Sequence, residues 1–235
     1  SPPCKHFSTA KDNRDPKKGM ELVRIFLDWI KIIQPKFWIM ENVRRSRKYI
    51  LGVSSQYHIP KIRILNSANY GVPQRRERMF AGDYVSPKPT HHKSPGFDIF
   101  GNRTKKWISV KKATNDLRNK SSKIANHNLT KWLDVKNYEN HYYMSLHKPI
   151  DLNKPSRTIL CDGGTNLKHP HVRFEIGEKY RRLTVRELAR LQSFPDDFVF
   201  YGSISSQYKM VGNAVPPELS KAFATAIIKK IKKKH

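Results

Sequence analysis

A helical pattern followed directly by a short apolar run is the feature that most constrains the fold of this chain. Residues 20–34 (MELVRIFLDWIKIIQ) place apolar side chains at helical spacing, and the pattern stops at Pro35. Residues 37–40 (FWIM) then have the length and composition of a buried parallel strand. Glu41 comes next, at the carboxyl end of that strand, where open α/β sheets bind their ligands. The pattern therefore predicts an α/β fold.

Local signals predict further strands and helices. Residues 61–65 and 78–81 are typical of strands, with a turn between them. A helix is expected at 185–192, capped by Thr184 with Glu187 at the capping-box position. The last helix is expected to begin near Pro216 and Pro217, because proline is tolerated in a first helical turn.

The character of the sequence changes at about residue 85. Prolines, glycines and scattered aromatic residues follow, and no long periodic segment appears before Arg182. Such a stretch is typical of a small irregular lobe. We therefore expect a division of the chain into residues 1–84, 85–205 and 206–235.

The balance of charge points to a polyanionic partner. The chain has 46 Lys and Arg side chains against 19 Asp and Glu, a formal net charge of +27. An excess of this size favours salt-sensitive binding of nucleic acid. A lysine-rich proteome is the alternative source of part of the excess. The terminal run 229–234 (KKIKKK) is typical of a solvated helix end.

Cysteine usage and hydropathy indicate the compartment. Only Cys4 and Cys161 are present, which excludes a disulfide framework and fits a reducing environment. No apolar stretch approaches the length of a membrane span, and no secretory signal is visible. We expect a cytoplasmic protein.

Five short motifs occur along the chain in a fixed order. They are residues 1–8 (SPPCKHFS), 41–43 (ENV), 74–78 (QRRER), 181–198 (RRLTVRELARLQSFPDDF) and 212–217 (GNAVPP). One three-letter motif matches easily by chance, but five in order do not. The set closely resembles the DNA (cytosine-5)-methyltransferases, nearly from end to end.

This resemblance implies a fold and an activity. The fold is a Rossmann-like methyltransferase sheet, here partial, with residues 1–84 as catalytic domain, 85–205 as target-recognition domain and 206–235 as a helix returning to the catalytic domain. The activity is transfer of a methyl group from S-adenosylmethionine to carbon 5 of a cytosine flipped out of double-stranded DNA. A prokaryotic, nucleoid-associated enzyme is implied, either a restriction-modification methylase or a stand-alone one.

Four residues are implied as catalytic. Cys4 is the nucleophile, since a thiolate that adds to carbon 6 converts the ring into an enamine able to attack a methyl sulfonium. Glu41 is expected to hydrogen-bond or protonate N3 of the ring, and Arg78 to hold its O2. Arg76 and Arg78 alternate in a strand-like segment, so both are expected on one face, with Arg76 supporting Cys4 and Glu41.

Contacts with DNA are implied for a loop and for recognition-supporting segments. Residues 5–18 (KHFSTAKDNRDPKK) are polar and basic and resemble the family's loop that closes over DNA, with a plain solvent loop as the alternative. The implied DNA contacts are Lys5, Ser8, Arg14, Gln74, Arg157, Thr158, Gly163 and Gly164.

The cofactor contacts are only partly represented. Pro3, Asn213 and Val215 resemble positions that touch S-adenosylmethionine, but the family's glycine-rich cofactor loop is absent from these 235 residues. Two explanations are open. The chain is a remnant of a longer one, or a second polypeptide carries the cofactor-binding motif.

Three alternatives to this interpretation are open. A zinc-dependent cytosine deaminase requires a His-x-Glu and a Cys-x-x-Cys motif, neither of which is present, and a zinc site at Cys161, His169 and His171 lacks a fourth ligand. No metal is therefore expected. A chain that binds DNA without catalysis and an RNA-directed member of the family are the other two alternatives.

Overall fold

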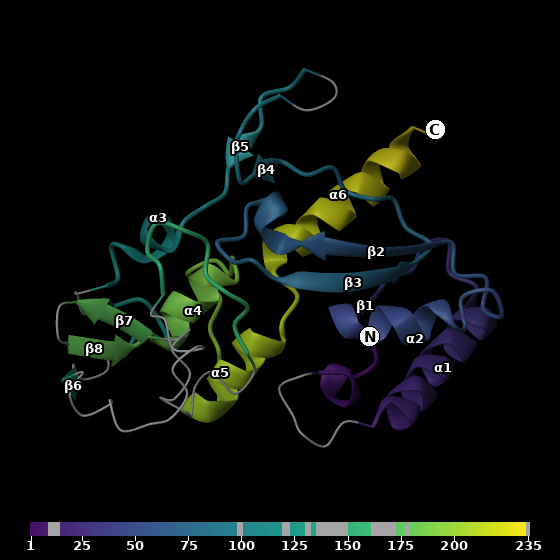
Figure 1. Ribbon diagram of the computed structural model, residues 1–235, viewed down its shortest axis with the longest axis horizontal. Coiled ribbons are helices and arrows are strands. Elements are labelled where there is room, and N and C mark those ends of the chain that lie inside the picture. Colours follow the sequence, from purple (N-terminus) through teal and green to yellow (C-terminus); the bar gives the residue numbers. More distant parts are fainter. Residues whose placement is uncertain are drawn as a thin grey trace. The chain divides into compact units, whose positions relative to one another are not determined.

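The chain folds into two compact units (Figure 1). Unit 1 comprises Ser1–Asn66, Glu77–Lys88 and Ala222–His235, and unit 2 comprises Ser67–Arg76 and Pro89–Lys221. The computed structural model describes residues 1–8, 15–97, 101–118, 123–129, 133–134, 150–160, 173–176 and 179–233. The boundaries of these units differ from those of the predicted functional domains 1–84, 85–205 and 206–235. The division into functional domains stays a prediction.

Unit 1 is built on a three-stranded sheet with helices. Its elements are η1 (Cys4–His6), α1 (Pro16–Ile33), β1 (Met40–Val43), η2 (Arg44–Ser46), α2 (Arg47–Leu51), β2 (Lys61–Asn66), β3 (Glu77–Gly82) and the part of α6 (Pro217–Lys232) from Ala222 onward. The strands expected at 61–65 and 78–81 and the helix after Pro216 are thus confirmed.

The sheet differs from the prediction in strand direction. Its order is β1-β3-β2, and β3 runs antiparallel to both neighbours. β1 and β2 run the same way because η2 and α2 connect them, whereas the ten residues between β2 and β3 return the chain in the opposite direction. The predicted buried parallel strand at 37–40 is wrong in pairing and in bounds. Strand β1 begins at Met40, so Glu41 lies inside it and not at its carboxyl end.

Helix α1 begins four residues before the predicted start because its N-terminus is capped. The Asp15 carboxylate accepts a hydrogen bond from the backbone N–H of Lys18 (3.0 Å), and Pro16 occupies the first helical turn. At the other end Gln34 adopts a left-handed conformation (φ 48°). The helix therefore stops directly before Pro35, as predicted.

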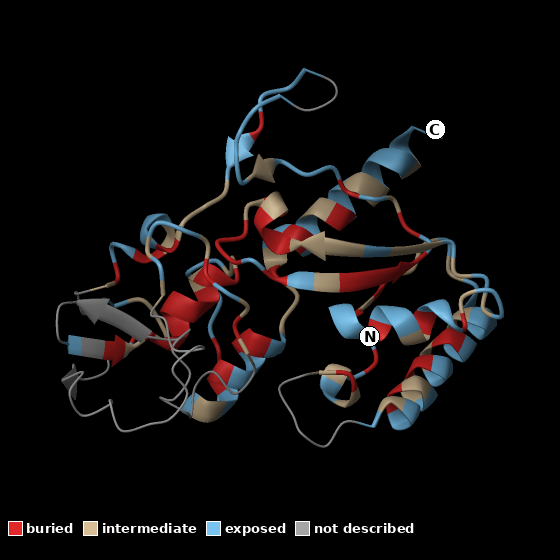
Figure 2. Ribbon diagram, in the orientation of Figure 1, coloured by how far each residue is buried: buried red, intermediate tan, exposed pale blue. Residues whose placement is uncertain are grey.

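Strand β3 is buried on both faces (Figure 2). Met79 and Ala81 share a hydrophobic cluster with Val23 and Leu27 of α1. Phe80 points to the opposite face, where its ring lies 4.8 Å from that of Phe223 in α6. The alternation along β3 thus places helices on both sides of the unit 1 sheet.

In its described residues, unit 2 contains short strands and the helices α3, α4 and α5, in addition to the start of α6. They are η3 (Ser67–Tyr70), β4 (His91–His92), β5 (Lys105–Lys106), α3 (Val110–Thr114), β6 (Leu133–Asp134), β7 (Arg173–Ile176), β8 (Lys179–Arg182), α4 (Val185–Leu191) and α5 (Ile204–Asn213). Strands β6, β8 and β7 form an antiparallel sheet. Helix α4 was predicted, and its capping box between Thr184 and Glu187 is present. Helix α5 was missed.

A fully buried ion pair holds the start of α4. Both carboxylate oxygens of Glu187 accept hydrogen bonds from the Arg181 guanidinium (2.6 and 2.9 Å), and neither side chain is exposed. Glu187 also accepts the backbone N–H of Thr184 (2.8 Å). One carboxylate therefore joins β8 to the N-terminus of α4.

No helix within the described ranges is both long and apolar enough to span a membrane.

We predict that Arg181→Met destabilises the protein by about 3–5 kcal/mol, because Glu187 would remain as a buried charge without its partner. The measurement is the free energy of unfolding in urea. The double variant R181M/E187Q should recover part of the loss, since it buries no charge. A single variant within 1 kcal/mol of the unaltered protein would contradict the assignment.

Candidate active site

The register of the unit 1 sheet brings Glu41 and Arg78 together. Glu41 pairs with Phe80 across the β1–β3 ladder, and Val43 pairs with Arg78. Glu41 and Arg78 are therefore diagonal neighbours on one face of the sheet, within reach of long side chains. Nε of Arg78 lies 3.3 Å from Oε1 of Glu41, and the two side chains are 15% and 19% exposed. The two side chains thus form an ion pair that is partly exposed to solvent.

Cys4 belongs to the same unit and to the same electrostatic cluster. It begins η1, in which its carbonyl accepts the backbone N–H groups of Phe7 and Ser8 (both 3.0 Å). Its side chain is a half-buried thiol that interacts electrostatically with the Arg78 guanidinium. The predicted nucleophile, acid and arginine are thus brought together within unit 1.

Asn42 ties the N-terminal segment to the sheet. Its side-chain amide donates to the carbonyl of Pro2 (3.2 Å), and its Oδ1 accepts the backbone N–H of Val43 (2.9 Å). The hydroxyl of Ser1 accepts the backbone N–H of Glu41 (2.9 Å). These bonds hold residues 1–3 along β1 and so fix the position from which Cys4 follows.

A buried aromatic side chain anchors the turn that contains Cys4. Phe7 is 2% exposed, and its ring lies 5.5 Å from that of Tyr49 in α2. It also packs against Gly19 of α1, where a Cβ would lie only 2.6 Å from the Phe7 ring. Glycine at this position allows the close approach of the η1 turn to α1.

Charge and burial act in opposite directions on Arg78. Burial lowers the pKa of its guanidinium, while the charges of Glu41 and Cys4 raise it. Because the ordinary pKa of arginine is so high, the group stays a cation at neutral pH. A permanent positive charge therefore lies beside a carboxylate and a thiol. Such a cation can stabilise negative charge that develops on a ring oxygen.

Arg76 lies in unit 2, immediately before β3, and is buried. Its guanidinium donates to the backbone carbonyls of Ile159 (3.0 Å) and Gly212 (2.9 Å). The first bond joins the QRRER segment to the segment that contains Arg157 and Thr158, and the second joins it to the end of α5. The predicted support of Cys4 and Glu41 by Arg76 stays a prediction.

Gln74 is a buried junction within unit 2. Its amide nitrogen donates to the Leu191 carbonyl (3.3 Å) and to Oε1 of Gln192 (2.9 Å), and its Oε1 accepts the backbone N–H of Ile159 (2.9 Å). The side chain is fully buried. Direct contact with DNA, predicted from sequence, stays a prediction that these bonds do not support.

The segment with Arg157 and Thr158 runs beside the QRRER segment in unit 2. Its backbone pairs with Pro73 and Arg75 through Ser156 (2.9 and 2.8 Å), and the Thr158 hydroxyl donates to the Arg75 carbonyl (3.1 Å). Arg157 is exposed and Thr158 is half-buried. No local signal predicts that residues so far apart in the chain pair in this way.

The remaining predicted contacts are described in part. Lys5, Pro3 and Asn213 are exposed, and Ser8 and Val215 are half-buried. Arg14, Gly163 and Gly164 lie outside the described residues. Cys161, His169 and His171 of the alternative zinc site also lie outside them. Within the described ranges, no cluster of three or more His, Cys, Asp or Glu side chains is arranged to hold a metal.

A basic run that was not among the predicted site residues adjoins the ENV motif. Residues 44–48 (RRSRK) follow β1 without a break, and Arg44 forms an ion pair with Glu77 (2.6 Å). The signal that was available is four cations among five consecutive residues next to a catalytic motif.

Comparisons with known proteins identify the family. Residues 1–229 match the family model of the C-5 cytosine-specific DNA methylases. The chain is 32% identical over 243 residues to type II methyltransferase M.AplI of Arthrospira platensis, covering 96% of this chain and 66% of the relative. It is 35% identical over 259 residues to type II methyltransferase M1.HphI of Haemophilus parahaemolyticus, covering 97% and 67%. The chain therefore belongs to the C-5 cytosine-specific DNA methylases, as the motifs predicted, and spans about two thirds of the length of these relatives.

Solved structures support the fold. The Schizosaccharomyces pombe Dnmt2 methyltransferase superposes with a TM-score of 0.63 at 15% identity, over 98% of this chain and 77% of that one. The Entamoeba histolytica methyltransferase EhMeth gives 0.62 at 15% identity, over 98% and 76%. The predicted Rossmann-like α/β methyltransferase class is confirmed.

Proposed function

We propose that this protein methylates carbon 5 of cytosine in double-stranded DNA, as the cytoplasmic modification enzyme of a restriction-modification system. The observation that carries the proposal is the grouping of Cys4, Glu41 and Arg78 within one compact unit. Membership of the C-5 cytosine-specific DNA methylases and the type II methyltransferases among its relatives support it.

Covalent catalysis begins at Cys4. Its thiolate adds to carbon 6 of cytosine and pushes electron density to carbon 5, which then accepts the methyl group. Loss of the proton from carbon 5 and elimination of the thiolate restore the aromatic ring, so Cys4 is regenerated. The η1 turn favours this role because Phe7 and the bonds along β1 fix its backbone.

Glu41 and Arg78 stabilise the ring while the thiolate is attached. The carboxyl of Glu41 is assigned to N3, and the cationic Arg78 to O2, where negative charge develops. Their separation of 3.3 Å and partial exposure leave both groups available to a base that enters from solvent. A base inside a duplex cannot reach a thiol, so the target nucleotide must first be flipped out.

S-adenosylmethionine is the proposed source of the methyl group. Pro3 and Asn213 are exposed and therefore accessible to it, whereas the principal cofactor loop of the family is absent from this sequence. The residues present could therefore supply only peripheral contacts to the cofactor.

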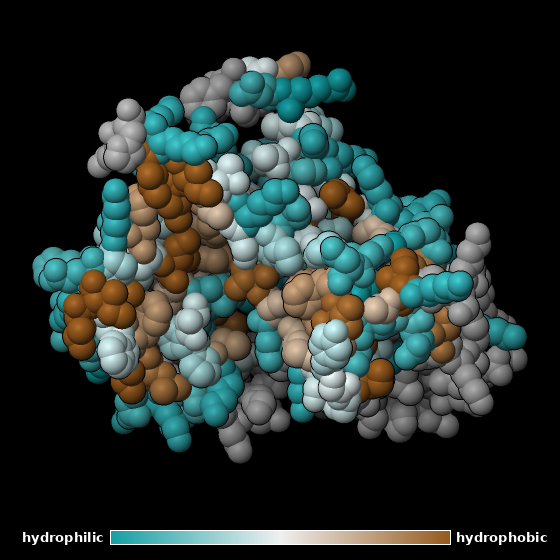
Figure 3. All heavy atoms as spheres, turned by 180° about the vertical axis from the view of Figure 1, so that it is seen from behind, coloured by the Kyte–Doolittle hydropathy of each residue, from teal (hydrophilic) through white to brown (hydrophobic). Residues whose placement is uncertain are grey.

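Helix α1 offers an apolar face on which a cofactor-binding segment could pack, whether that segment belongs to a longer form of this chain or to a second polypeptide. Ile25, Trp29, Ile32 and Ile33 are 54%, 58%, 73% and 63% exposed, a large apolar area for one helix. Figure 3 shows that such hydrophobic areas interrupt a mostly hydrophilic surface. Burial of these side chains would favour association by the hydrophobic effect.

On this assignment, adding a polypeptide with the cofactor loop should slow amide hydrogen exchange in α1, because packing on the helix suppresses its local opening. Exchange mass spectrometry makes the measurement, and the exposed end of α6 provides the comparison segment. Unchanged exchange in α1 with a polypeptide that restores activity would exclude this face.

We predict that the protein forms a denaturant-stable adduct with a duplex that contains 5-fluorocytosine when S-adenosylmethionine and any separate cofactor polypeptide are present. Fluorine at carbon 5 cannot leave as a proton does, so the thioether to carbon 6 persists. Cys4→Ser should abolish the adduct, as resolved by denaturing gel and by peptide mass. An adduct that survives in this variant would remove Cys4 from the mechanism.

A second prediction concerns Glu41 and Arg78 and does not require methyl transfer. Thiolate addition alone allows the hydrogen at carbon 5 to exchange with solvent, so release of tritium from [5-³H]cytosine in duplex DNA reports on the addition step. Glu41→Gln and Arg78→Met should each slow this release by about 10²-fold, the effect typical of losing one stabilising group. The exposed pair Asp151 and Lys154 supplies control variants, which should release tritium at the unaltered rate.

A further inference from the structure

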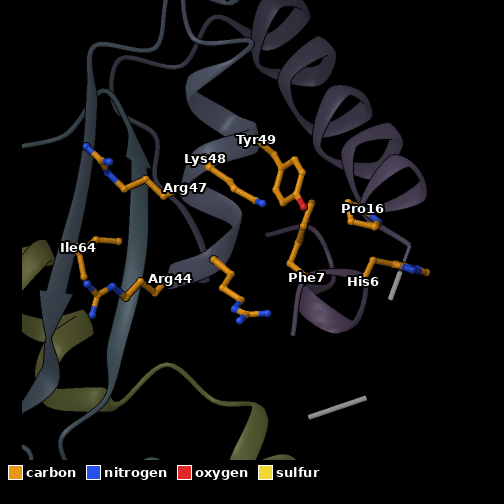
Figure 4. Close-up of a pocket in the computed structure, with 9 residues that line it drawn as sticks. His6, Phe7, Pro16, Arg44, Arg47, Lys48, Tyr49 and Ile64 are labelled. Atoms are coloured by element: carbon orange, nitrogen blue, oxygen red, sulfur yellow. The ribbon is translucent and has the colours of Figure 1, made fainter. Parts of the chain in front are cut away.

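A basic cavity of about 880 Å³ opens in unit 1 (Figure 4). It is lined by His6, Phe7, Pro16, Arg44, Arg45, Arg47, Lys48, Tyr49 and Ile64. Four of these side chains are permanent cations and none is a carboxylate. The cavity therefore selects for a ligand with negative charge.

Three of the four cations have no carboxylate to neutralise them in the described part of the chain. Arg44 pairs with Glu77 (2.6 Å), but no described salt bridge includes Arg45, Arg47 or Lys48. All four are exposed. Neighbouring like charges repel one another, and a bound anion would relieve this repulsion.

The walls of the cavity combine these cations with aromatic groups. The rings of Tyr49 and Phe7 lie 5.5 Å apart at an angle of 34°, and the Lys48 ammonium lies 4.8 Å from the centre of the Tyr49 ring. In Figure 4, Arg44, Arg47 and Ile64 lie on one side of the space, and His6, Phe7 and Pro16 lie on the other. A negatively charged strand can lie between such walls.

The cavity adjoins the candidate active site through the chain itself. Two of its lining residues, His6 and Phe7, belong to the turn that begins at Cys4, and Arg44 follows β1, whose end pairs with Arg78. The cavity therefore lies within three residues of Cys4 along the chain, and Arg44 and Arg45 directly follow β1. A sulfonium cofactor is positively charged, so this cavity disfavours it.

We propose that this cavity binds the phosphates of the DNA strand next to the target cytosine, with Arg45, Arg47 and Lys48 as the principal contacts. The inference rests on the proposed function and adds a phosphate-binding surface to it. Phosphate contacts position a duplex without reading its sequence. Contact here would hold the strand in place while the base leaves the stack, which requires energy from backbone contacts.

The test measures binding of a fluorescently labelled duplex by anisotropy between 50 and 200 mM salt, a range over which phosphate contacts dominate the change in affinity. The variant R45Q/R47Q/K48Q should bind about tenfold more weakly and should lower the slope of log K against log salt by about 2–3, because each lost phosphate contact removes about 0.9. The matched control K229Q/K230Q/K232Q removes the same charge from exposed positions at the end of α6 and should leave the slope nearly unchanged.

A charge-preserving variant separates lost contacts from damaged folding. R45K/R47K keeps both cations, so it should retain the slope of the unaltered protein, and thermal unfolding should show all variants folded. Equal slopes for the cavity variant and the α6 control would overturn the proposal. Unchanged duplex binding with loss of pyrophosphate binding would instead indicate a small-anion site and would also overturn it.

The two proposals can fail separately. If the Cys4 adduct does not form but the cavity variant loses salt-dependent binding, the cavity assignment stands and the catalytic one falls. If the adduct forms and the cavity variant binds DNA normally, the reverse holds.

Discussion

The antiparallel register between β1 and β3 is the constraint on which the candidate active site depends. It sets Glu41 and Arg78 diagonally on one face. A slip by one residue would turn every β3 side chain to the other face and would separate this pair. Packing prevents the slip, since Met79 and Ala81 belong to one hydrophobic cluster while Phe80 contacts Phe223 on the other side. The positions of catalytic side chains are therefore fixed by apolar neighbours that take no part in chemistry.

The sequence predicted elements better than it predicted how they pair. Apolar periodicity and capping residues are local signals, so α1, α4, α6, β2 and β3 could be placed within a few residues. Strand direction depends on connections that no local signal describes. The run 37–40 shows the difficulty, because Gly82 at φ 144° allows the Trp38 carbonyl to approach so closely that any Cβ there would collide with it. The ladder therefore begins only at Met40, and Glu41 lies inside β1.

For the site, the sequence could name the residues but could not separate their roles. Gln74, Arg76 and Arg78 belong to the same five-residue motif. Gln74 and Arg76 are nevertheless buried and hydrogen-bonded to backbone groups of unit 2. Arg78 forms an ion pair with Glu41 and interacts electrostatically with Cys4. Buried polar side chains need partners, and those partners come from segments distant in the sequence. Helix α5 was not predicted, because its buried face includes polar residues such as Gln207 and so shows no clear apolar periodicity.

Two arginine–glutamate pairs in this chain show how burial separates structure from function. Arg181 and Glu187 are wholly buried, 2.6 Å apart and hydrogen-bonded to further backbone groups, so a ligand could reach neither without a large desolvation cost. Arg78 and Glu41 are 3.3 Å apart, with 15% and 19% of their side chains exposed. A looser pair with access to solvent can exchange part of its mutual attraction for hydrogen bonds to an entering ring at little cost. The same two residue types thus fasten a helix in one unit and leave a polar surface ready for a ligand in the other.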